Sequence, residues 1–198
     1  MLILEGADLV GKTTLAHKLI AEMNQRGWPH VYRHLSKLPD AWRAQATSNY
    51  SRLASPYIVQ DRFHVSEPVY AWIRGEKPMM TPQSYSDVEA VLRIDAKFTV
   101  IIVADASLIE RRYIAEREMY SLEKVLKVNA LYRHILDTGE IHGYETEVHH
   151  SIVCTEGDEW PSGISEICDK YERHLSLVAP YTGAHSYGVP HRHSAAQA

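Results

Sequence analysis

The sequence has few cysteines, no long apolar run and no excess of basic residues, and each shortage excludes a class of protein. Only Cys154 and Cys168 occur among 198 residues, so we expect two buried free thiols in a reducing compartment rather than a disulfide scaffold. No stretch approaches the roughly 20 apolar residues of a membrane-spanning helix. The N-terminus lacks a basic segment followed by a long apolar one. We therefore expect a cytoplasmic protein with no secretory leader and no membrane partner.

The charge balance argues against a nucleic-acid partner. The chain carries 21 Lys and Arg against 25 Asp and Glu, a formal net charge of -4, whereas a broad nucleic-acid footprint needs a basic face. Apolar residues make up 45% of the chain, which suffices for a globular core. We expect one domain over residues 1–180 and a mobile or peripheral tail over 181–198. Its histidines His185, His191 and His193 have no acidic or cysteine partner at ligand spacing, so we expect no metal there.

Short apolar runs alternate with longer amphipathic segments along the chain. The expected strands span residues 2–5, 30–35, 56–60, 98–104 and 151–154. The expected helices span 13–26, a stretch through Trp72 and Ile73, 85–94, 108–136 as one helix or two, and 164–178. This alternation predicts an α/β fold, a parallel sheet of about five strands with helices on both faces. The fully apolar run at 98–104 is typical of a strand buried on both faces.

The first motif follows the first expected strand and reads GADLVGKT over residues 6–13, which matches G-x-x-x-x-G-K-[ST]. Glycines let the backbone curl until its N–H groups converge on phosphate oxygens, and the next helix points its positive end at the anion. Lys12 supplies a mobile charge for the outer phosphates, and the Thr13 hydroxyl can ligate magnesium. The motif therefore predicts a loop that binds ATP with Mg²⁺. Its expected contacts are Gly6, Ala7, Asp8, Leu9, Val10, Gly11, Lys12, Thr13 and Thr14.

The second motif, QDRFHVSE at residues 60–67, follows the third expected strand. Parallel sheets present ligands at the carboxyl ends of their strands. Asp61 can organise magnesium and its waters or orient the attacking oxygen, and the planar fork of Arg62 can clamp an acceptor phosphate. Phe63 is expected either in the acceptor pocket or in the core, and Tyr70 follows on a helix where its ring can hold a base.

Together, EGADLVGKTT and DRFHVS resemble the motifs of the thymidylate kinase branch of the P-loop nucleotide kinases and of the related deoxynucleoside kinases. The resemblance covers about residues 1–178 and implies a P-loop NTPase-type fold. It implies that Asp8 contacts the sugar hydroxyl of the acceptor nucleotide. Family members are often dimers, which implies a homodimer by analogy alone.

An arginine-rich segment, IERRYIAERE, follows the fourth expected strand. It resembles the lid of nucleotide kinases, whose arginines close over the phosphates during transfer. Arg117, Arg112 and Arg111 are the lid candidates, in that order. The alternative is a solvated helix face on which neighbouring glutamates pair with these arginines.

The segment after the second expected strand separates two acceptor classes. The related nucleoside kinases carry a glutamate base there, whereas this chain reads RHLSKLPDAW and has Asp40 as its only carboxylate. A monophosphate acceptor is already ionised and needs cations instead, which Arg33 and Lys37 are placed to supply. The T-R-E-P-G-G element of thymidylate kinases is missing, and their A-Y-Q element reads VYA at residues 69–71, so the base stays open.

We therefore predict a nucleoside monophosphate kinase that uses ATP and Mg²⁺ to phosphorylate dTMP or a related or modified pyrimidine deoxynucleotide. The catalytic candidates are Lys12, Asp61, Arg62, Arg112 and Arg117. The substrate candidates are Asp8, Arg33, Lys37, Arg62, Phe63 and Tyr70, and the metal candidates are Thr13 and Asp61. The alternatives are a deoxynucleoside kinase with Asp40 or Asp61 as its base, a nucleotide-binding regulatory P-loop protein, and a polynucleotide end kinase.

Overall fold

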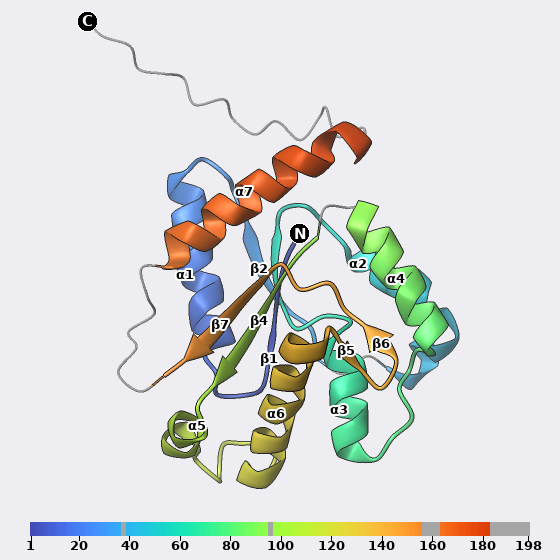
Figure 1. Cartoon of the computed structure of the whole chain (residues 1–198), viewed down its shortest axis with the longest axis vertical. Helices are drawn as coiled ribbons and strands as arrows, with labels where there is room; N and C mark the ends of the chain where they lie inside the picture. The colour runs from blue at the N-terminus through green and yellow to red at the C-terminus, as the bar shows by residue number, and fades with distance from the viewer. Residues whose placement is uncertain (37–38, 95–96, 156–162, 183–198) are drawn as a thin grey trace, which may run out of the picture.

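A five-stranded parallel sheet forms the centre of the molecule. The computed structural model describes residues 1–36, 39–94, 97–155 and 163–182 (Figure 1). The strands are β1 (Leu2–Gly6), β2 (Val31–His34), β3 (Ile58–Asp61), β4 (Phe98–Ala104) and β7 (His150–Cys154). Their order is β2-β3-β1-β4-β7, and every adjacent pair runs parallel. Because β1 lies between β3 and β4, the connection from β3 to β4 carries the chain past β1 into the other half of the sheet. Sheets with such a reversal of strand order bind ligands at the carboxyl ends of the strands beside it.

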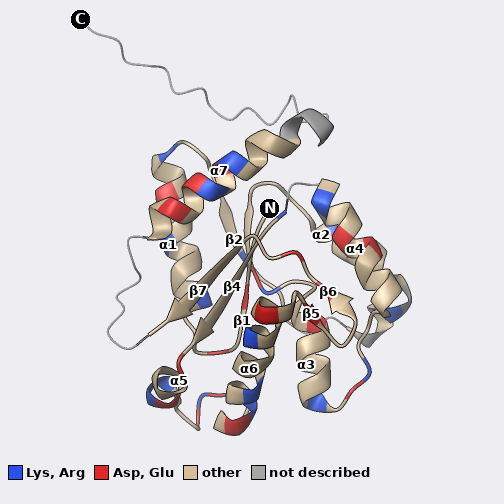
Figure 2. Ribbon diagram, viewed as in Figure 1, with Lys and Arg blue, Asp and Glu red and all other residues tan. Residues whose placement is uncertain are grey.

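Helices cover both faces of the sheet. Figure 1 shows α1 (Lys12–Gln25) and α7 (Gly163–Thr182) on one side, and α2 (Ala46–Leu53), α3 (Ser66–Arg74), α4 (Pro82–Ile94) and α6 (Leu122–Thr138) on the other. A short helix, α5 (Ala106–Arg112), follows β4. Every residue of β1 and β4 is buried, because both strands have helices above and below them. In Figure 2 the strands are mainly uncharged, whereas α5, α6 and α7 carry interspersed basic and acidic residues.

The predicted α/β fold is confirmed. The segment predicted over 108–136 as one helix or two is two helices, α5 and α6, separated by residues 113–121. Four differences in detail follow. Helix α7 ends at Thr182, two residues inside the expected tail. The 3₁₀ helix η1 (Asp40–Gln45) and helix α2 were not predicted. Nor was the small antiparallel hairpin of β5 (Glu140–Ile141) and β6 (Tyr144–Glu145).

Three further expectations concern the cysteines, the membrane and the tail. Cys154 and Cys168 are both buried and, among the described residues, neither forms a disulfide, as predicted. Within the described ranges, no helix has the length and apolar character needed to cross a membrane. The tail histidines lie outside the described residues.

Candidate functional site

The loop between β1 and α1 has a backbone that its glycines make possible. Gly6 ends β1 in register with Ile102 of β4, and a Cβ at Gly6 would lie 2.3 Å from the carbonyl oxygen of Ile102. Gly11 precedes α1 with a φ of 92°, and Leu9 between them has a φ of 68°. Both values are in the left-handed region that glycine adopts at little cost. The loop therefore turns tightly against the sheet before the helix begins.

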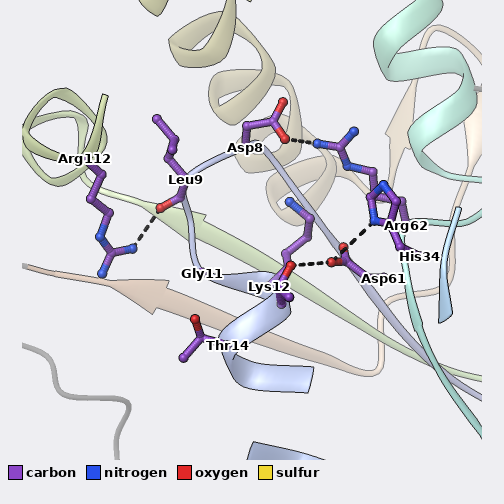
Figure 3. Close-up of a pocket in the computed structure, with 10 residues that line it drawn as sticks. Asp8, Leu9, Gly11, Lys12, Thr14, His34, Asp61, Arg62 and Arg112 are labelled. Carbon is purple, nitrogen blue, oxygen red and sulfur yellow. Dashed lines mark hydrogen bonds and ion pairs between the residues drawn. The ribbon is translucent and has the colours of Figure 1, made fainter. Parts of the chain in front are cut away.

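This loop forms one wall of a cavity of about 500 Å³ at the carboxyl ends of β1, β2 and β3. Figure 3 shows its lining side chains. They come from the loop, from the first turn of α1, from the ends of β2 and β3, and from α5. The lining residues are Asp8, Leu9, Gly11, Lys12, Thr13, Thr14, His34, Asp61, Arg62 and Arg112.

Lys12 places a buried positive charge inside the loop. Its side chain is 6% exposed, and its Nζ donates a hydrogen bond of 2.5 Å to the carbonyl oxygen of Ala7. Burial and, to a lesser extent, the nearby Arg62 lower the pKa of Lys12 to about 8, against the opposing effect of Asp61. A cation in this position is stabilised by an anion entering the loop.

Asp61, the last residue of β3, accepts hydrogen bonds from side chains of α1 and β2. Its Oδ2 accepts hydrogen bonds from the Thr13 hydroxyl at 2.9 Å and the Tyr32 hydroxyl at 3.0 Å. The Nδ1 atom of His34 lies 3.6 Å from the same oxygen. The other oxygen, Oδ1, is buried and has no hydrogen-bond partner in the described part of the chain. A buried carboxylate oxygen beside a threonine hydroxyl is a donor set that suits Mg²⁺.

Arg62 links the loop to the opposite wall of the cavity. Its φ of 64° turns the chain sharply after β3, and its backbone N–H donates to Leu4 O at 2.9 Å. The guanidinium forms an ion pair with Asp8 and lies 4.5 Å from the ring centroid of Tyr70. The Tyr70 hydroxyl also donates to Asp8, at 3.3 Å. The two predicted acceptor contacts, Asp8 and Arg62, therefore hold each other in place.

A second cavity of about 280 Å³ adjoins the first and shares His34 and Arg62 with it. Its lining contains basic side chains, aromatic rings and two carboxylates, mainly from η1, α2, α3 and the segment before α6. The remaining lining residues are Leu35, Ser36, Arg43, Tyr50, Phe63, Ser66, Glu67, Tyr70, Arg74, Glu76, Lys77, Met79, Met119 and Tyr120.

Glu5 fixes the turn that carries the DRF motif. Its side chain is fully buried, and Oε1 accepts the backbone N–H of Phe63 at 2.8 Å. Its Oε2 accepts the hydroxyls of Ser66 at 2.5 Å and Tyr132 at 3.0 Å. One carboxylate therefore joins β1, the start of α3 and α6 behind the second cavity.

The structure brings most of the predicted site residues together, but Arg33 and Arg117 line neither cavity. Side chains alternate along a strand, so Tyr32 and His34 face Asp61 while Arg33 points to the other side. Arg33 donates to Gln60 Oε1 at 2.5 Å and to the carbonyl oxygen of Leu53. It lines neither cavity, so the expectation that it clamps an acceptor phosphate is not supported. Lys37 lies outside the described residues.

The lid arginines divide into two groups. Arg112 donates to the carbonyl oxygen of Leu9 at 2.8 Å and lines the first cavity. Arg111 and Arg117 are exposed and line neither of the two cavities. The closing movement of this segment stays a prediction.

Sequence reasoning missed several residues that line or support the site. His34 ends β2 at the carboxyl edge of the sheet, and that position was a usable signal. Arg43 and Arg74 belong to helical segments with no motif, and no local pattern pointed to them. Glu5 precedes the glycine loop, but a fully buried carboxylate cannot be recognised from spacing alone.

Comparison with known proteins supports the fold. The chain is similar to the SPbeta prophage-derived uncharacterized protein YorR of Bacillus subtilis (strain 168), at 27% identity over 146 residues that cover 73% of this chain and 86% of that protein. A crystal structure of YorR from Bacillus subtilis, in complex with phosphorylated GDP, superimposes with a TM-score of 0.64 at 22% identity, over 89% of this chain and 96% of that one. No protein-family model matches the chain.

Proposed function

We propose that the chain transfers the terminal phosphoryl group of ATP to the 5′-phosphate of a deoxynucleoside monophosphate. The observation that carries this proposal is the pair of adjoining cavities that share Arg62 and His34. One cavity is built on the glycine loop with Lys12, and the other is lined by further cations and by aromatic rings. Phosphoryl transfer requires two such sites, because donor and acceptor must meet in line.

The first cavity suits the donor phosphates. Backbone N–H groups and Lys12 would hold the phosphate oxygens, and Arg112 lies at the rim to offset the charge that develops during transfer. A magnesium ion held by Thr13 and Asp61 would neutralise part of the phosphate charge. The unpartnered oxygen of Asp61, buried beside the Thr13 hydroxyl, supports that assignment.

The second cavity suits an acceptor that already carries a phosphate. Arg62 stands between the cavities, where its planar fork can hold the acceptor phosphate opposite the donor. Arg43, Arg74 and Lys77 add positive charge to the lining, a role that the sequence had assigned to Arg33 and Lys37. An ionised phosphate needs these cations and no general base.

The comparisons support a nucleotide as the occupant. The YorR structure contains phosphorylated GDP, and the thymidylate kinase-like motifs point to a nucleotide acceptor as well. The expected dTMP comes from the resemblance alone, so the acceptor panel must include purines.

A deoxynucleoside acceptor is the second candidate, and His34 favours it. His34 lines both cavities and lies 3.6 Å from Asp61. In that reaction, His34 takes the proton of a 5′-hydroxyl, the oxygen attacks the terminal phosphorus of ATP, and ADP leaves. Asp61 would orient the ring.

The test is ADP release from ATP and Mg²⁺ with each deoxynucleoside and its 5′-monophosphate as acceptor. Lys12→Ala removes the buried cation of the loop, and Lys18→Ala, an exposed lysine on the same helix, is the matched control. We expect turnover with at least one monophosphate, at least 100-fold loss in Lys12→Ala, and no change in Lys18→Ala. Turnover with nucleosides alone would replace the first candidate by the second. Acceptor-independent hydrolysis alone would contradict both and favour a regulatory protein.

A further inference from the structure

Glu67 has an unusual position inside the second cavity. It lies in the first turn of α3 and lines the cavity. Its Oε1 accepts the backbone N–H of Met79. Its Oε2 is buried and has no hydrogen-bond partner among the residues that the structure describes. A buried acceptor atom without a donor costs free energy unless a ligand supplies one.

The surroundings show what kind of donor fits. Burial raises the pKa of Glu67, while the amides of Met79 and Met80 and the cations Arg43 and Arg74 oppose that shift. The carboxyl group is therefore held by backbone amides, and the cations Arg43 and Arg74 that act on it share the lining of the cavity. Its unpartnered oxygen can accept an N–H donor that enters with the ligand.

Among the common bases, guanine alone presents two adjacent N–H donors on its Watson–Crick edge, N1–H and the 2-amino group. A carboxylate accepts two parallel N–H bonds in a fork-to-fork arrangement. Here Oε2 is unpartnered, and Oε1 keeps a second lone pair beside the bond that it accepts from Met79. Adenine and cytosine place an acceptor nitrogen beside their amino group, and thymine flanks its single N–H with two carbonyl oxygens. Each of these would set an acceptor against one of the oxygens of Glu67.

The rest of the lining suits the same base. Guanine carries its O6 acceptor next to N1–H, and a guanidinium at Arg43 or Arg74 can donate to it. The rings of Tyr70 and Tyr120, with centroids 5.8 Å apart, provide aromatic surface next to the base position.

We propose that Glu67 is the specificity-determining residue of the second cavity and selects a guanine nucleotide as its occupant. The inference rests on the proposed function only for the statement that the occupant is the phosphoryl acceptor. The base preference itself is a property of binding and can be measured without turnover.

The experiment compares dGMP with dIMP, which lacks only the 2-amino group. The measured quantities are the dissociation constants from isothermal titration calorimetry without ATP, and kcat/KM with ATP and Mg²⁺. We expect the wild-type protein to favour dGMP over dIMP by about 10-fold or more, and over dTMP by about 10- to 100-fold. Glu67→Gln keeps the size and the acceptor for Met79 but replaces one carboxylate oxygen with an amide donor. In this variant we expect the dGMP:dIMP ratio to fall to within about 3-fold of unity.

A ratio between two ligands of one variant is insensitive to a general loss of folded protein. ATP binding to Glu67→Gln provides the folding check, since the donor cavity does not include this residue. Glu123→Gln removes a carboxylate from an exposed position on α6 and should keep the wild-type ratio.

The outcomes separate this inference from the proposed function. Turnover of dTMP or another monophosphate with ratios that Glu67→Gln leaves unchanged would overturn the role of Glu67 and keep the kinase. Preferential dGMP binding that Glu67→Gln abolishes, with no ADP release for any acceptor, would support the guanine site and overturn the kinase. Absence of dGMP binding to the wild-type protein would overturn the guanine site.

Discussion

Replacing Gly6 by alanine tests whether the loop between β1 and α1, which we propose to bind phosphate, depends on close packing between β1 and β4. The added methyl carbon would lie 2.3 Å from the carbonyl oxygen of Ile102 and 3.1 Å from Cγ2 of Val10. Ordinary van der Waals contacts begin at 3.4 Å, so β1 and β4 would have to separate by about 1 Å in a close-packed core. The obstacle is the backbone of a central strand, which cannot rotate away as a side chain can.

The expected loss in the free energy of unfolding follows from the rigidity of this strand. Overpacking a core typically costs about 1–3 kcal/mol, and a clash with backbone in the middle of the sheet belongs at the upper end. We expect Gly6→Ala to lower the free energy of unfolding by about 3 kcal/mol or more, from a total of about 5–15 kcal/mol for a typical domain. ATP binding should weaken in the fraction that stays folded, because the loop begins at this residue.

Gly75→Ala is the control. Gly75 also has a positive φ, 70°, but its added Cβ would meet nothing within 4 Å. Only the left-handed backbone is then penalised, at about 1 kcal/mol. Urea denaturation followed by far-UV circular dichroism measures both variants. If Gly6→Ala lost no more stability than Gly75→Ala, the close contact between β1 and β4 would not constrain the loop, and this reasoning would be refuted.

Three further predictions concern charged groups. Burial lowers the pKa of Lys12 to about 8, so the free protein loses this charge as the pH rises through that value. Calorimetry should therefore show ATP affinity falling between about pH 7 and pH 9.5, whereas Lys12→Met should bind weakly with a much smaller dependence on pH. Arg62→Lys keeps the charge but loses the planar fork. We expect the KM of the acceptor to rise about 10- to 100-fold while the KM of ATP changes far less, and equal changes in both values would contradict the acceptor role. Lys97 and Glu89 form a buried ion pair, with side chains 1% and 7% exposed. Lys97→Ala should destabilise the fold by about 3–5 kcal/mol in urea denaturation, and Lys97→Met with Glu89→Gln should recover part of that loss; no recovery would show that the pair is not the source.

The sequence predicted the sheet well because its strands are covered on both faces. The seven residues of β4 are all apolar or threonine and all buried. An apolar run of that length is typical of a strand that is covered on both faces. Helix α2 is the opposite case. Only Ala46 and Tyr50 of its eight residues are buried, and the helical period that they form with Leu53 is too short to stand out from the sequence. The break between α5 and α6 was also ambiguous, since residues 113–121 contain neither proline nor glycine.

The residues of the candidate site also fall into two groups, those that a local sequence pattern predicts and those that only the tertiary structure brings together. The glycine loop and the DRF motif are local patterns, and their side chains meet because both follow central strands. Arg33 and His34 are adjacent in the sequence, and the choice between them depended on which face of β2 turns toward Asp61. That choice is set by the pairing of β2 with β3, which residue types do not reveal. Glu67 and Arg74 lie two turns apart on α3, but Arg43 joins them only through tertiary packing, so the acceptor side was largely invisible beforehand.

The two adjoining cavities also differ in how well their lining residues tolerate substitution. In the proposed kinase, the donor cavity is built largely on backbone turns and strand ends that the core constrains, so replacing the residues that set those turns disturbs folding and chemistry together. The acceptor cavity is lined largely by side chains of helices and of the loops beside them, and many of these can be exchanged one at a time. Acceptor preference is therefore evolvable in this architecture: a few substitutions on α3 and the preceding helices can change the base that is accepted while the machinery for handling phosphate is inherited intact.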